Sequence, residues 1–414
     1  METFVANSNR IFSNINYKFI NKFQTDKQMR NSKGITLQNT LLFRFKYTEN
    51  NTTKTNISCT INYKNKKDVH RTCYLRKEQN LSLNLYKFLS KQVYNNCNKI
   101  NKKMIVAVDG TCSNDISHNV ALNMGYYNVS NNLVLDLTHN GNENRNKEIK
   151  NLKEHINDNK QLYKNTIIVG DRAYFSYELM SFLKKNNIDF IIRCKGKNIK
   201  NTNNNRIVYS SDQYEKTIWS CHKKRKREKK VLLVNNDCTL LTSIMNKSDN
   251  ELMEIYKSRW NIETYFKIIK KHFKIQHTKE KHESAIGINK ILCCTSIITN
   301  IASTIKNNFE TCNNKINTSL LLYYINNYLL EKIINGSLTV EDIYNAKYFA
   351  LTVVNNDERH FPRISKTPFT KWYVKGYSNY SEINKIVDAI ENNNIHLLDK
   401  NKKLQVQNII SIKK

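Results

Sequence analysis

Short apolar runs alternate with amphipathic stretches between residues 104 and 193, and this pattern predicts a mixed α/β domain. Apolar runs of about four to eight residues between turn residues are typical of buried strands, whereas apolar positions at helical spacing are typical of helices. The order is three strands, a helix, a strand, a helix and a strand. We expect strands at 104–108, 120–129, 133–137, 166–169 and 189–193, and helices at 143–163 and 174–185.

This order of elements matches the one that an RNase H-like fold requires. In that fold the first three strands of a mixed sheet follow one another as a meander, and the later strands are reached through helices. Residues 130–132, Ser-Asn-Asn, have the composition of a hairpin turn between the second and third strands. We therefore predict an α/β, RNase H-like catalytic domain.

The regions around this pattern differ from it. Residues 1–100 are polar, with one amphipathic stretch at 81–94, and are predicted to be a helical DNA-binding region. The catalytic domain is expected to span 101–345 and to contain a small β insertion at 195–244, built from four short strand-like runs. Residues 346–414 hold the only two prolines, Pro362 and Pro368, and are predicted to be a separate basic tail.

A helix is predicted from Ser248 to about Phe273, since Ser248 and Glu251 form the sequence pattern of a capping box. At about 100° per residue, one edge of this helix would carry a phenol, a guanidinium, a carboxylate and an ammonium group within roughly 60°. These four residues are Tyr256, Arg259, Glu263 and Lys270. The alternative is an ordinary amphipathic helix with solvated charges at its rim.

Composition narrows the possible partners. The chain has 414 residues and a formal net charge of +32, which favours a polyanion such as DNA or RNA, although AT-rich codon usage could account for some of the lysines. No uninterrupted apolar run reaches the roughly 18 residues of a membrane helix, and the N-terminus has no apolar core of a secretory signal. We therefore expect no membrane association. The ten cysteines form no CxxC pair, which disfavours a zinc site.

Two aspartates are candidates for metal ligands. Asp109 and Asp171 are each expected directly after a buried strand, in Val-Asp-Gly and Val-Gly-Asp. Because adjacent strands lie about 4.8 Å apart, two carboxylates placed there could share one hard cation such as Mg²⁺. Each aspartate could instead do no more than cap the turn that follows it. Glu263 could supply a third carboxylate.

These segments resemble the DDE transposases of the "insertion sequence four" group. The Tyr-Arg-Glu-Lys motif of that group is matched by YKSRWNIETYFKIIKK, and its two aspartate motifs by MIVAVDGT and IIVGDRAYFSYELMSFLKKNNIDFIIRCK. The resemblance extends to LLTSI and to RHFPRISKTPFTKW in the tail. It covers roughly residues 104–305 and part of the tail, and only loosely residues 1–100. Ala173 stands where the family is expected to have glycine.

The resemblance implies an enzyme that cleaves DNA at the transposon ends and joins those ends to target DNA. Asp109, Asp171 and Glu263 would bind two Mg²⁺ ions, for which Mn²⁺ could substitute. The family also implies a homodimer that acts on paired terminal inverted repeats inside the cell, in the nucleus if the host is eukaryotic. Contacts to DNA are implied for a further set of residues, which are Tyr256, Arg259, Lys270, Arg172 and Trp219.

Several alternatives remain at this stage. Trp219 could be a core residue rather than a base-stacking one, and the basic run 223–230 could be a nuclear localisation sequence or a phosphate-contacting loop. The chain could be a domesticated transposase that binds DNA without cutting it, but its complete acidic triad argues against this. Another RNase H-like nuclease, such as a junction resolvase, is disfavoured by the β insertion and the Tyr-Arg-Glu-Lys helix.

Overall fold

The computed structural model describes most of the chain. The described residues are 1–23, 35–50, 52–66, 69–98, 103–114, 120–139, 147–194, 206–221, 227–275, 285–311, 314–353 and 409–413. The chain divides into two compact units, each considered by itself. The first comprises residues 1–193, 201–206 and 241–354, and the second comprises residues 194–200, 207–240 and 355–414.

The centre of the first unit is a mixed sheet with the strand order β3-β2-β1-β4-β5. The first three strands form an antiparallel meander, whereas β4 is parallel to both β1 and β5. This arrangement confirms the predicted order of strands and the mixed α/β class. The strands are β1 (Ile105–Asn114), β2 (Val120–Asn128), β3 (Leu133–His139), β4 (Ile167–Gly170) and β5 (Asp189–Arg193).

Strand β1 is longer than the sequence pattern predicted. The apolar run ends at Val108, but β1 continues to Asn114 because residues 109–114 remain paired with β2. Asp109 therefore lies within β1, opposite Gly125, and the prediction that it directly follows the strand was wrong. The predicted hairpin turn is present, and Asn132 has the positive φ of 54° that such turns require.

The helices that follow the meander are shorter than predicted. The helix predicted at 143–163 is α7 (Glu148–Asp158) followed by α8 (Lys160–Tyr163), and residues 143–146 lie outside the described part. The backbone leaves the helical region at Asn159, which separates the two. The helix predicted at 174–185 begins later, as α9 (Tyr177–Lys185), because Ser176 caps it. A short 3-10 helix, η3 (Arg172–Tyr174), precedes α9.

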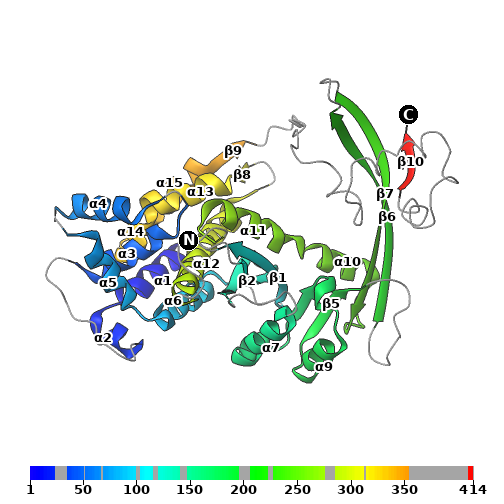
Figure 1. Cartoon of the computed structure of the whole chain (residues 1–414), viewed down its shortest axis with the longest axis horizontal. Helices are drawn as coiled ribbons and strands as arrows, with labels where there is room; N and C mark the ends of the chain where they lie inside the picture. Colours follow the sequence, from blue (N-terminus) through cyan, green and yellow to red (C-terminus); the bar gives the residue numbers. More distant parts are fainter. Residues whose placement is uncertain are drawn as a thin grey trace. The chain divides into compact units, whose positions relative to one another are not determined.

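The N-terminal helices lie in the same compact unit as the sheet and gather beside α12 (Ala285–Phe309) in Figure 1. A buried ion-pair cluster joins these helices to α12. Glu78 pairs with Arg44 at 2.8 Å and with Lys290 of α12 at 3.2 Å. The N-terminal elements are α1 (Glu2–Ser13), α2 (Tyr17–Ile20), η1 (Asn21–Phe23), α3 (Leu37–Tyr47), α4 (Lys54–Asn65), α5 (Arg71–Gln79) and α6 (Leu83–Cys97).

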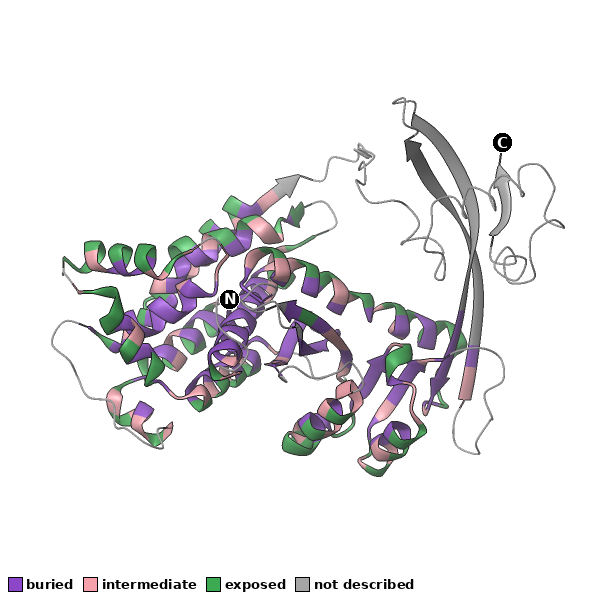
Figure 2. Ribbon diagram, in the orientation of Figure 1, coloured by how far each residue is buried: buried purple, intermediate pink, exposed green. Residues whose placement is uncertain are grey.

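Helix α12 is the core helix of this unit. Among the described residues it alone is long and apolar enough to cross a membrane, but 83% of its most apolar window is buried inside the protein. Asn300 fixes it to the sheet by accepting a hydrogen bond from the Val134 backbone N–H and donating one to the Val134 carbonyl. Figure 2 shows the buried residues concentrated along α12 and the strands.

The remaining elements complete the two units. After α12 come β8 (Asn314–Ile316), α13 (Thr318–Tyr324), the π-helix η4 (Ile325–Leu329), α14 (Leu330–Asn335), α15 (Val340–Ala350) and β9 (Leu351–Val353). The β insertion contains two 16-residue strands, β6 (Arg206–Cys221) and β7 (Arg227–Thr242), so the four short strands predicted there were wrong. Strand β10 (Ile409–Lys413) pairs with β7, whereas Pro362 and Pro368 lie outside the described residues.

Candidate active site

The register of the parallel strands brings the two candidate aspartates together. Ala107 of β1 is paired with Val169 of β4, so extending the register by two residues places Asp109 opposite Asp171. Strand β4 ends at Gly170, and Asp171 is the first residue beyond it. Neighbouring strands lie about 4.8 Å apart. The two carboxylates are therefore neighbours at the carboxyl edge of β4.

The environment of Asp109 disfavours its charged form. Burial and the negative charge of Asp171 raise the pKa of Asp109 to about 7, against the opposing effect of the Arg259 charge. The Glu263 charge raises this pKa further. A carboxyl group whose ionisation is disfavoured by two neighbouring carboxylates lies in a region of negative potential. A cation bound there would be stabilised.

Both aspartates also make local hydrogen bonds of the kind expected for turn caps. Asp109 Oδ1 accepts a hydrogen bond from the Gly110 backbone N–H at 2.9 Å. Asp171 Oδ1 accepts one from Ala173 N–H at 2.8 Å and thereby caps η3. The capping role weighed from the sequence is thus present for Asp171, whereas Asp109 lies within β1 and caps no turn. Each of these local bonds uses one oxygen of the carboxylate.

The helix predicted from Ser248 to Phe273 is in fact two helices. The predicted capping box of Ser248 and Glu251 is confirmed at the start of α10 (Asp249–Lys257), and α11 (Trp260–His272) follows it after a turn. Tyr256 therefore lies on α10, whereas Glu263 and Lys270 share α11. The backbone remains in the helical region at Ser258 and Arg259, so the turn interrupts the helix without redirecting the chain. Arg259 lies in the turn between the helices and is the N-terminal cap residue of α11.

Arg259 joins Glu263 to the aspartates. Its Nη2 donates a hydrogen bond to Glu263 Oε1 at 2.7 Å, and its Nη1 lies 4.0 Å from Asp109 Oδ2. Only 6% of Arg259 is exposed. Its guanidinium group also lies over the Tyr256 and Trp260 rings, at 5.8 and 5.7 Å from their centroids. The guanidinium is thus a buried positive charge that holds Glu263 near Asp109.

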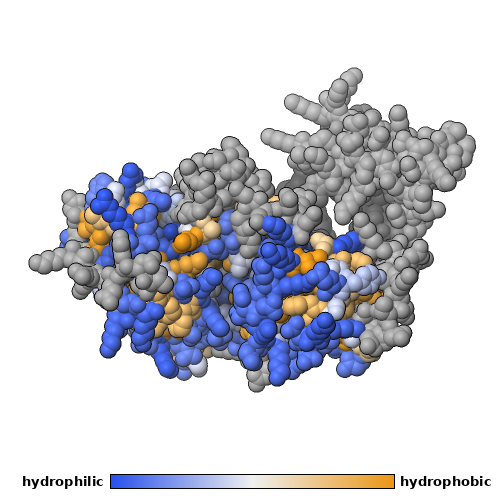
Figure 3. Space-filling model, turned by 60° about the horizontal axis from the view of Figure 1, so that its bottom comes forward, coloured by the Kyte–Doolittle hydropathy of each residue, from blue (hydrophilic) through white to orange (hydrophobic). Residues whose placement is uncertain are grey.

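The other residues implied in DNA contact are spread more widely. Tyr256 is buried, Lys270 is half-buried and Arg172 is exposed on η3. Trp219 lies in β6, but the described part of the structure does not include its side chain. In the coloured, described part of the face seen in Figure 3, hydrophilic side chains predominate and hydrophobic areas lie between them.

The donor groups at this edge fit a hard divalent cation. Mg²⁺ and Mn²⁺ prefer carboxylate oxygens, and Asp109 in β1, Asp171 directly after β4 and Glu263 in α11 supply these. Within the described ranges, no three histidine, cysteine or acidic residues already form a closed metal-binding group. The Arg259 guanidinium lies between two of these carboxylates, since it bonds Glu263 and lies 4.0 Å from Asp109.

Two residues near this site were missed by sequence reasoning. Glu148 opens α7, and Tyr174 ends η3. Burial raises the pKa of Tyr174 well above its usual value, and the charges of Glu148, Asp109 and Asp171 raise it further. The phenol therefore lies among these carboxylates. The sequence gives no periodic pattern that would select either residue, because both are the first or last residue of a short element.

Comparison with known proteins places this site in a family context. Residues 123–298 match the model of the transposase DDE domain, and this range contains Asp171 and Glu263. A curated protein named as a transposase for insertion sequence element IS4SA, from Synechocystis sp. (strain ATCC 27184 / PCC 6803 / Kazusa), is 30% identical over 142 residues. That alignment covers 31% of this chain and 38% of the relative.

The region 123–298 is therefore similar to a transposase DDE domain, and part of the chain is similar to an insertion-sequence transposase of the IS4 type. The matched part spans less than half the length of the curated relative. Among solved structures, a cryo-EM structure of the piggyBac transposase synaptic complex with hairpin DNA aligns over 91% of both chains, with a TM-score of 0.43 and 10% identity. A likeness of that size supports no statement about this chain.

Proposed function

We propose that this protein is a cut-and-paste DNA transposase that cleaves DNA at the transposon ends and joins those ends to target DNA. One observation carries the proposal. The register of β1 and β4 places Asp109 beside Asp171, and Arg259 links Glu263 to Asp109. Three carboxylates from distant parts of the sequence thus gather at one edge of the sheet, which ordinary folding stability does not require.

The catalytic domain is proposed to be RNase H-like. The support is the strand order β3-β2-β1-β4-β5, with an antiparallel meander followed by parallel strands reached through helices. Residues 101–345 would form this domain, with 195–244 as its β insertion, 1–100 as a DNA-binding region and 346–414 as a basic tail.

Asp109, Asp171 and Glu263 would hold two Mg²⁺ or Mn²⁺ ions. When bound, these ions would activate the attacking oxygen and stabilise the leaving oxygen of an in-line displacement at phosphorus. The chain itself contributes rigid placement of the carboxylates by β1, β4 and α11. Because a divalent cation and a guanidinium compete for the same Glu263 oxygen, Arg259 is expected to turn towards a DNA phosphate when the site is loaded.

The DNA substrate is proposed from charge and family. A net charge of +32 supports binding along a nucleic-acid backbone. Arg172 and Lys270 would contact phosphates, Tyr256 would position the end, and Trp219 would stack on a base. The partners would be terminal inverted repeats and target DNA, bound by a homodimer inside the cell.

Alanine variants of the three carboxylates test this proposal. Asp109→Ala, Asp171→Ala and Glu263→Ala should each abolish nicking of a terminal-repeat fragment and leave binding within a few-fold, since binding depends mainly on Lys and Arg. Glu254→Ala is the matched control, because Glu254 is an exposed carboxylate on α10 that pairs with Lys257 on the same helix. Specific binding without any nicking by the wild-type protein would instead support a domesticated DNA-binding protein.

A further inference from the structure

Glu148 reaches the proposed active site from the opposite face of the sheet to Glu263. Asp109 is paired with Gly125, so the two share a face, and a side chain on Gly125 would lie 2.7 Å from Phe266 of α11. The next residue, Gly110, must therefore face the other way. There a side chain on Gly110 would lie 2.7 Å from Glu148 Oε1. The carboxylate of Glu148 thus occupies the space left by the missing side chain of Gly110.

The two faces of the sheet are open to each other beyond Gly170, because β4 ends there. Strand β1 continues to Asn114, whereas its parallel neighbour β4 stops at Gly170. Beside Asp109 there is consequently no further strand on the β4 side, and groups from both faces can meet there. Helix α7 packs against β1 and η3, which brings its first residue to this gap.

An unsatisfied hydroxyl group lies in the same gap. Tyr174 is completely buried, and its hydroxyl has no hydrogen-bond partner among the described residues. Its pKa is raised first by burial and then by the charges of Glu148 and Asp109, so the hydroxyl lies close to both carboxylates. A buried hydroxyl without a hydrogen-bond partner is destabilising, because it has lost its bonds to water. This hydroxyl would be satisfied by water or another oxygen held between those carboxylates.

We propose that Glu148 is a fourth carboxylate of the metal site formed by Asp109, Asp171 and Glu263, with the Tyr174 hydroxyl donating a hydrogen bond within that site. This inference rests on the proposed function, because it assumes that divalent ions bind at Asp109 and Asp171. The competing explanation is that Glu148 only stabilises the first turn of α7 through the helix dipole.

Binding of Mn²⁺ to the full-length protein without DNA separates these explanations. The measurement is the Mn²⁺ concentration that gives half of the maximal rise in melting temperature. Glu148→Gln keeps the shape of the side chain and should raise this concentration about 10-fold, the size of effect expected for lost metal-site partners. Glu341→Gln is the matched control, since Glu341 is also a first-turn acid, on α15, and is exposed. It should change the midpoint less than about twofold, as a purely helix-stabilising acid would.

A second variant tests the same contact without changing Glu148. Gly110→Ala should displace the flexible Glu148 carboxylate and weaken Mn²⁺ binding to a similar extent. Because both changes remove one contact, the double variant should be no weaker than either single variant.

An unchanged Mn²⁺ midpoint in Glu148→Gln would overturn this inference. Asp109→Asn distinguishes that result from failure of the proposed function. If Asp109→Asn abolishes the Mn²⁺ effect while Glu148→Gln does not shift it, the metal site stands and Glu148 is only a helix-stabilising residue. If the Mn²⁺ effect persists in Asp109→Asn, the metal site itself is wrong, and the assignment of Glu148 falls with it.

Discussion

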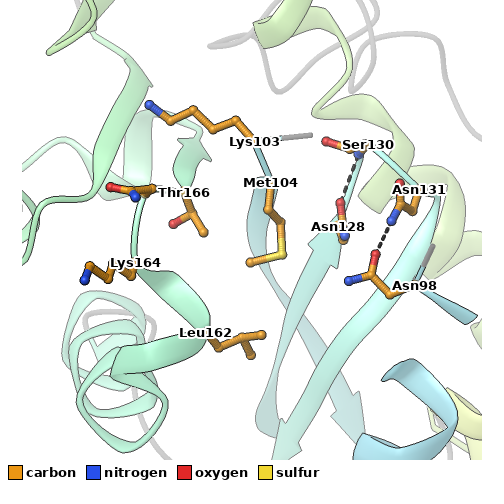
Figure 4. Close-up of a pocket in the computed structure, with 10 residues that line it drawn as sticks. Asn98, Lys103, Met104, Asn128, Ser130, Asn131, Leu162, Lys164 and Thr166 are labelled. Atoms are coloured by element: carbon orange, nitrogen blue, oxygen red, sulfur yellow. Dashed lines mark hydrogen bonds between the residues drawn. The ribbon is translucent and has the colours of Figure 1, made fainter. Parts of the chain in front are cut away.

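The two edges of the central sheet differ in how their polar groups are satisfied. At the amino edge, an open cavity of about 580 Å³ lies between the starts of β1 and β4 and the end of β2 (Figure 4). Several of its polar side chains bond to one another or to the surrounding fold, although Asn131 Oδ1 has no partner among the described residues. Lys103 pairs with Asp189 at 2.5 Å, Asn128 Oδ1 accepts a hydrogen bond from Ser130 N–H, and Asn131 bonds to Asn98.

The carboxyl edge shows the opposite condition. Asp109, Asp171 and Glu263 bring like charges together, a buried guanidinium bridges two of them, and the Tyr174 hydroxyl has no partner among the described residues. The cavity of about 580 Å³ thus lies at the other edge of the sheet from these three carboxylates. For this fold, unsatisfied charge locates the candidate active site, whereas cavity volume does not.

The largest expected difference in cleavage is between a variant that removes a charge at the carboxyl edge and one that removes a charge at the amino edge. Asp109→Asn should reduce DNA cleavage by about 1,000-fold or more, because a bound metal ion loses a charged ligand. Lys103→Ala should leave cleavage within about threefold, since a partly exposed ion pair contributes about 0–1 kcal/mol. Single-turnover nicking of one end fragment measures both variants. Equal losses at the two edges would contradict the contrast between them.

DNA cleavage should be more sensitive to a conservative substitution of Arg259 than to one of Lys270. Arg259→Lys keeps the charge but removes the planar fork that bonds Glu263 and reaches Asp109, so cleavage should fall about 100-fold while DNA binding changes only a few-fold. Lys270→Arg should retain most activity, because Lys270 acts chiefly as a charge. The test is single-turnover cleavage together with binding. Normal cleavage by Arg259→Lys and loss of cleavage in Lys270→Arg would reverse these roles.

The crowding of carboxylates predicts a pH-dependent stability in the absence of divalent ions. The pKa of Asp109 is raised from 3.8 to about 7 on folding, so the folded protein holds a proton there that the unfolded chain has lost. Stability should therefore decline as pH rises between these two values, at no more than about 1.4 kcal/mol per pH unit, and this contribution should be constant above about pH 7.

Thermal unfolding in EDTA across this pH range provides the measurement. Asp109→Asn should show a flatter curve than the wild-type protein, since the amide does not ionise. Lys103→Ala at the amino edge should keep the wild-type slope. A wild-type slope in Asp109→Asn would show that other groups cause the pH dependence.

The smallest expected effect concerns salt. If Lys270 binds one DNA phosphate, Lys270→Ala should weaken specific and random DNA alike by a few-fold, and should reduce the slope of log K against log salt by about one unit. Lys164→Ala removes an exposed lysine beside the amino-edge cavity and should leave the slope unchanged. Equal slopes in Lys270→Ala and the wild-type protein would exclude the phosphate contact.

The predictions from sequence succeeded where local pattern decides structure. Strand β5 has the predicted bounds, and the capping box at Ser248 is present, because burial period and capping chemistry act within a few residues. The predicted ends of strands and helices were wrong where contacts with a neighbouring element determine them. β1 extends through polar residues because β2 pairs with it, and the helix break before Arg259 has no proline or glycine to announce it.

The sequence by itself predicted Asp109, Asp171 and Glu263 as candidate metal ligands, through their place at the ends of apolar runs and in the Tyr-Arg-Glu-Lys pattern. Only the tertiary structure decided which groups share their space. The contact of Arg259 with Asp109 and the approach of Glu148 to Gly110 depend on how α11 and α7 pack against β1. Such contacts join residues far apart in the chain, and no local period encodes the distance between them.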